Sequence, residues 1–113
     1  MTDRELLELA AKAAEIECEI EEFSGGRCLG TNQHNEIVFD PLTDDGDAFR
    51  LAVHLRMMID FIKDGVWFER YKQNHVVAVG DEESHYELIE TDPYAATRRA
   101  ITRAAAEIGR TTT

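Results

Sequence analysis

Apolar residues recur every three or four positions in three segments of the chain, which is the spacing of one helix face. The first segment follows a capping box formed by Thr2 and Glu5, so it predicts a helix over residues 3–14. The second follows a cap at Thr43 or Asp44, and the third begins at Asp92-Pro93 and is expected to end at Gly109. The pattern therefore predicts three helices.

The second of these helices has apolar residues around much of its circumference. They form a main face and a second row beside it. The main face holds Ala48, Leu51, Ala52 and Leu55, and the second row holds Phe49 and Val53. A helix with this pattern is expected to pack against a neighbouring helix as well as against a sheet.

Strand patterns fill the intervals between the helices. Residues 16–21 alternate strictly between apolar and acidic, and Cys28-Leu29 with Ile37–Phe39 predicts a second strand, interrupted by a polar loop or bulge. Four more short strands, separated by turn residues, predict an antiparallel meander. They are expected over residues 57–62, 66–71, 75–79 and 85–90.

Together these elements predict a single domain over residues 1–113, with residues 110–113 as a frayed tail. The expected order is α-β-β-α-β-β-β-β-α. Because runs of strands lie between the helices, the predicted class is α+β. The predicted architecture is a mostly antiparallel sheet of five to six strands with three helices in sandwich-like layers.

Charge is distributed unevenly along the chain, whose net charge is −11. Residues 1–47 carry thirteen acids and three bases, whereas residues 92–113 carry two acids and four bases. An acidic field repels nucleic acid and anionic membrane surfaces and attracts basic partners. It therefore argues against base stacking by Trp67, Phe68 and Tyr71, because phosphate attraction supplies most nucleic-acid affinity.

Three glutamates, Glu17, Glu19 and Glu21, share the outward face of the first predicted strand. They form a candidate partner-binding stripe for a basic protein. The alternative is a solvated strand face that discourages edge pairing.

The sequence predicts no catalytic residue, cofactor or metal site. Aligning an EF-hand loop on Gly46 puts Pro41 at the first ligand position and Ala52 at the last, so both end ligands are missing. Cys18 and Cys28 lack metal-ligand spacing and are interpreted as buried or free thiols. The four histidines also lack such spacing, although His75 and His85 are expected to be neighbours if their strands pair.

No apolar run is long enough to span a bilayer, and residues 1–5 lack the features of a signal peptide, so the expected location is cytoplasmic.

Three segments together resemble a known family. Residues 5–14, Pro41–Val53 and Asp92–Gly109 are similar to the phage ABA-sandwich domain, found in small tailed-phage and prophage proteins of unknown function. Two positions depart from the family pattern: Glu15 stands where a glycine is frequent, and Phe39-Asp40 stands where Trp-Asn is frequent. The resemblance implies a phage or prophage origin, a compact α/β sandwich and a bacterial cytoplasm, and it carries over no catalytic residue.

The leading hypothesis is a non-enzymatic accessory protein that binds an unknown host or phage protein, with its oligomeric state left open. A second hypothesis is an acidic nucleic-acid mimic that blocks a host DNA- or RNA-binding protein. A third is a weak metal-dependent hydrolase that uses Asp44, Asp45 and Asp47.

Overall fold

The computed structural model describes residues 2–16, 19–20, 28–32, 35–62, 75–79, 84–89 and 92–111. Within these residues the helices are α1 (Asp3–Ala13), α2 (Asp45–His54) and α3 (Pro93–Thr111). The strands of one sheet are β1 (Glu19–Ile20), β2 (Cys28–Asn32) and β3 (Asn35–Phe39). Those of a second sheet are β4 (Met58–Ile62), β5 (His75–Val79) and β6 (Ser84–Leu88).

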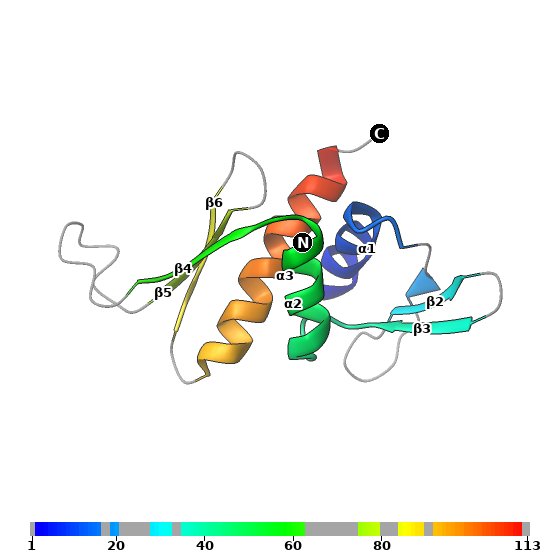
Figure 1. Ribbon diagram of the computed structural model, residues 1–113, viewed down its shortest axis with the longest axis horizontal. Coiled ribbons are helices and arrows are strands. Elements are labelled where there is room, and N and C mark those ends of the chain that lie inside the picture. Colours follow the sequence, from blue (N-terminus) through cyan, green and yellow to red (C-terminus); the bar gives the residue numbers. More distant parts are fainter. Residues whose placement is uncertain are drawn as a thin grey trace.

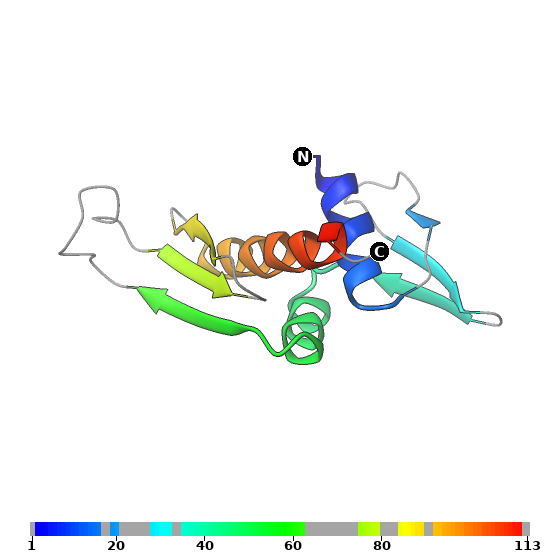
Figure 2. The ribbon, with the colours of Figure 1, turned by 90° about the horizontal axis from the view of Figure 1, so that it is seen from above.

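The three helices lie in the middle of the molecule, and the two sheets lie on opposite sides of them (Figure 1). The long helix α3 is the central element. It packs along α1, contacts α2, and carries β5 and β6 on another side. Figure 2 shows the same arrangement from above, with β4 forming the edge of its sheet that lies nearest α2.

The predicted fold is wrong in its sheet and in its element order. Among the described residues the strands form two separate antiparallel sheets of three strands each, and the order of the described elements is α-β-β-β-α-β-β-β-α. The three helices lie between these two sheets (Figure 1), whereas the prediction placed the helices in layers against one sheet of five to six strands. The reason lies in α3, whose small buried residues allow close packing on several sides at once and so keep the sheets apart.

Two strand predictions also need correction. The interrupted second strand is a hairpin, in which β2 pairs with β3 from Cys28 opposite Phe39 to Asn32 opposite Asn35. In the second sheet β4 pairs directly with β5, Met58 opposite Val79. The predicted meander placed a strand of residues 66–71 between them, and those residues lie outside the described part of the chain. Apolar alternation identifies strands but says nothing of their pairing.

The helix starts follow the sequence closely. Thr2 accepts a hydrogen bond from the amide of Glu5 at α1, and Asp44 accepts one from the amide of Asp47 at α2. Asp92 Oδ1 accepts bonds from the amides of Tyr94 and Ala95. Side-chain acceptors of this kind satisfy amides that have no partner within the helix. All three predicted caps are therefore confirmed.

The end of α3 differs from the prediction. The helix continues to Thr111, and Gly109 lies buried within it rather than terminating it. A Cβ at Gly109 would stand 1.9 Å from the carbonyl oxygen of Leu9 in α1. Glycine is thus needed here for the close approach of two helices, and not for a left-handed cap.

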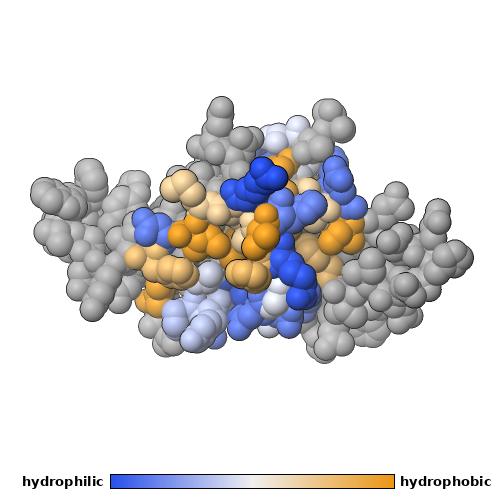
Figure 3. Space-filling view, in the orientation of Figure 1, coloured by the Kyte–Doolittle hydropathy of each residue, from blue (hydrophilic) through white to orange (hydrophobic). Residues whose placement is uncertain are grey.

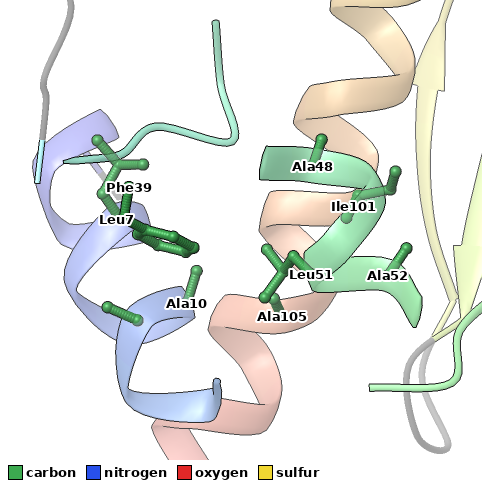
Figure 4. Packing of buried hydrophobic residues seen from close by; sticks show 9 residues of the cluster. Leu7, Ala10, Phe39, Ala48, Leu51, Ala52, Ile101 and Ala105 are labelled. Carbon is green, nitrogen blue, oxygen red and sulfur yellow. The ribbon is translucent and has the colours of Figure 1, made fainter. Parts of the chain in front are cut away.

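The core is built largely from small residues. Its main cluster joins α1, β3, α2 and α3 through Leu7, Ala10, Ala11, Phe39, Ala48, Leu51, Ala52, Ile101 and Ala105 (Figure 4). Figure 4 shows Leu7, Phe39, Leu51 and Ile101 as the larger side chains among alanines. A second cluster, under the β4–β5–β6 sheet, contains Ala78, Ala96, Ala100 and Ala104.

Candidate functional site

Helix α2 turns two hydrophobic residues toward solvent. Its inward side buries Ala48, Leu51 and Ala52. Phe49 and Val53 are four residues apart on another side of the helix, and they remain 69% and 60% exposed. The expected packing of α2 against a neighbouring helix is confirmed, because its buried side clusters with Ile101 and Ala105 of α3. The second apolar row, Phe49 and Val53, takes no part in that packing.

Strand β4 adds two further exposed side chains. Met58 is 71% exposed and Phe61 is 61% exposed. Their odd spacing directs them to opposite faces of the sheet. Among the described strands, β4 lies at one edge of its sheet. Figure 3 shows hydrophobic side chains gathered over α2 and β4 on the face in view. We call Phe49, Val53, Met58 and Phe61 the α2–β4 face.

Charges of both signs surround the α2–β4 face. Residues 44–61 carry four acids and two bases, and Arg98 of α3 forms an ion pair with Asp45. Asp60 is exposed between Met58 and Phe61, and among the described residues it makes no ion pair. The exposed Asp44 and Asp45 stand at the first turn of α2. Monomeric proteins seldom expose several large hydrophobic side chains together, and such patches are often sites where a partner binds.

The aspartates considered for a metal site each have a structural role. Asp44 caps α2, with its Oδ2 2.8 Å from the amide nitrogen of Asp47. Asp45 Oδ1 lies 2.6 Å from Nη1 of Arg98. Asp47 accepts bonds from the amide of Asp40, at 2.9 Å, and from the guanidinium of Arg50, at 2.5 Å. These contacts explain the aspartates without a metal ion.

Asp40 is the one buried carboxylate near this turn, at 4% exposure. Its Oδ2 accepts a hydrogen bond from the hydroxyl of Thr43, whereas its Oδ1 has no partner among the described residues. Its backbone carbonyl accepts bonds from the amides of Thr43 and Asp44. Asp40 therefore holds the turn that leads into α2.

A pocket of about 490 Å³ lies on the other flank of α2. Phe39, Leu51, Ala14 and Ile16 supply apolar lining, and Asp47, Arg50 and His54 supply polar lining. Because Asp47 is already bonded to Arg50 and to the amide of Asp40, it is poorly placed to act as a free base. Among its described lining residues, the carboxylate of this pocket is bonded to an arginine and to a backbone amide, and not to a group that could exchange a proton with a substrate.

A second pocket, of about 370 Å³, lies where α1, β6 and α3 meet, and Arg99, Arg103, His85 and Glu107 contribute to its lining. Arg103 Nη1 lies 2.5 Å from Oε1 of Glu87, and Arg99 Nη1 lies 3.0 Å from Oδ1 of Asp3. A hydrogen bond from Arg110 holds the pKa of Glu107 below its usual value of 4.5. Each arginine has an acidic partner, so the pocket has little surplus positive charge.

The proposed glutamate stripe falls mostly outside the described residues. Glu19 is in β1, opposite Leu29 of β2, while Glu17 and Glu21 lie outside them. The stripe stays a prediction.

The α2–β4 face was missed at the sequence level, although its signal was present in the apolar row of Phe49 and Val53.

The histidine prediction was wrong in its register. Strands β5 and β6 do pair, but His75 lies opposite Leu88, and His85 lies opposite Ala78. The two histidines are therefore not cross-strand neighbours. Within the described part of the chain, no three side chains of His, Cys, Asp or Glu are grouped so that they could hold a metal ion.

Comparisons with protein-family models, with curated proteins and with solved structures find no match to this chain. Among the described residues, no helix is both long enough and apolar enough to cross a membrane.

Proposed function

We propose that the protein is a non-enzymatic accessory protein of a phage or prophage, which acts in the bacterial cytoplasm by binding another protein through the α2–β4 face. The observation that carries the binding role is the exposure of Phe49, Val53, Met58 and Phe61 on two adjoining elements. The resemblance of residues 5–14, Pro41–Val53 and Asp92–Gly109 to phage proteins supports the origin.

The energetics of hydrophobic burial support a docking role. Covering a Phe or Met side chain that was in water contributes roughly 1.5–3 kcal/mol. Burial of Phe49 and Val53, which share one side of α2, together with Met58 or Phe61 of β4, would offset part of the entropy that association costs. Aromatic residues and Met are also the apolar types enriched at protein interfaces.

The structural use of the aspartates supports a non-enzymatic role over a hydrolase. Asp44, Asp45 and Asp47 are engaged by an amide or by arginines, so recruiting them to a metal would break contacts that hold α2 in place. We do not favour nucleic-acid mimicry either, because its main support is a stripe of which only Glu19 is described.

Site-directed photocrosslinking tests the proposal. A benzophenone amino acid is placed at Phe49 or at Phe61, and, as a matched control, at the exposed Lys12 of α1, and each variant is expressed in a bacterial host. The expected result is that positions 49 and 61 crosslink the same partner, while position 12 does not. The proposal fails if positions 49 and 61 give no product beyond that of position 12.

A further inference from the structure

We draw no further inference here: the strongest candidate, the patch of exposed apolar side chains on α2 and β4, belongs to the site already described, and nothing in the described residues shows what covers it.

Discussion

Glu15 and Arg56 adopt left-handed backbone conformations, with φ of 60° and 54°. Each directly follows the C-cap of a helix, and each takes part in the same pair of hydrogen bonds. At α1 the amide of Glu15 donates to the carbonyl of Lys12, and that of Ile16 donates to Ala11. At α2 the amide of Arg56 donates to Val53, and that of Met57 donates to Ala52. Both helices therefore end in a Schellman motif, in which glycine is the usual residue.

We predict that Glu15→Gly and Arg56→Gly each stabilise the protein. Replacing a side chain in the left-handed region by glycine relieves a strain of about 1–2 kcal/mol. The greater freedom of glycine in the unfolded chain opposes this gain by about 0.4–1 kcal/mol. The net expectation is about 0.5–1 kcal/mol in the free energy of unfolding, measured by urea denaturation. Glu15→Ala and Arg56→Ala are the controls, because alanine keeps the strain. A loss of stability in both glycine variants would show that these side chains hold the helix ends.

The pKa of Glu107 reports on the electrostatics at the end of α3. A hydrogen bond from Arg110 holds its pKa below 4.5, with smaller contributions from the positive charges of Arg110 and His85. An NMR titration of the Glu107 carboxyl carbon should therefore show a midpoint below 4.5, and Arg110→Gln should raise that midpoint toward 4.5. An unchanged midpoint in Arg110→Gln would contradict the assigned cause.

Helices α1 and α3 depend on each other through a close backbone approach. The buried Gly109 of α3 lies where any Cβ would meet the carbonyl of Leu9 at 1.9 Å. The neighbouring Ala10, Ala105 and Ala106 are also buried and small. This contact accounts for the course of α3 past Gly109 to Thr111.

Gly109→Ala should separate these helices. Adding a methyl group to a tightly packed site costs about 1–3 kcal/mol, even though alanine favours helix more than glycine does. Thermal unfolding should show a lower midpoint than that of the wild type. Lys12→Ala, an exposed change on α1, should leave the midpoint nearly unaltered. If Gly109→Ala proved as stable as the wild type, the close approach would be absent in solution.

The helices were well predicted because their signals are local. Thr2, Asp44 and Asp92 act as caps where the sequence placed them, and Ala48, Leu51 and Ala52 form the buried face of α2. The packing of α2 against a neighbouring helix was also predicted, and its contact with α3 confirms it. The exposure of Phe49 and Val53 was not foreseen, because an apolar row does not reveal which part of it the fold will cover.

At the scale of the whole molecule, the sequence predicted strand positions better than strand pairing. Residues 58–62, 75–79 and 84–88 are strands close to the expected places. Pairing depends on contacts between residues distant in the chain, such as Met58 with Val79, and no local pattern encodes these. The division into two sheets likewise follows from the packing of α3 and not from any strand.

The candidate site could be inferred only once the molecule was assembled. Phe49 and Val53 belong to α2, while Met58 and Phe61 belong to an edge strand that ordinary strand signals would place anywhere in a sheet. Their exposure is a property of the assembled fold, and Figure 3 shows hydrophobic side chains gathered on the face in view.

The most direct test of the proposed α2–β4 face is an amide NMR map of the whole labelled protein, recorded as the partner that crosslinks at positions 49 and 61 is added. The chemical-shift changes should concentrate in Asp45–His54 and Met58–Ile62, and the amides of α1 should stay nearly unmoved. Changes centred on α1 or on the β1–β2–β3 sheet, with α2 and β4 unaffected, would contradict the α2–β4 face as the site of binding.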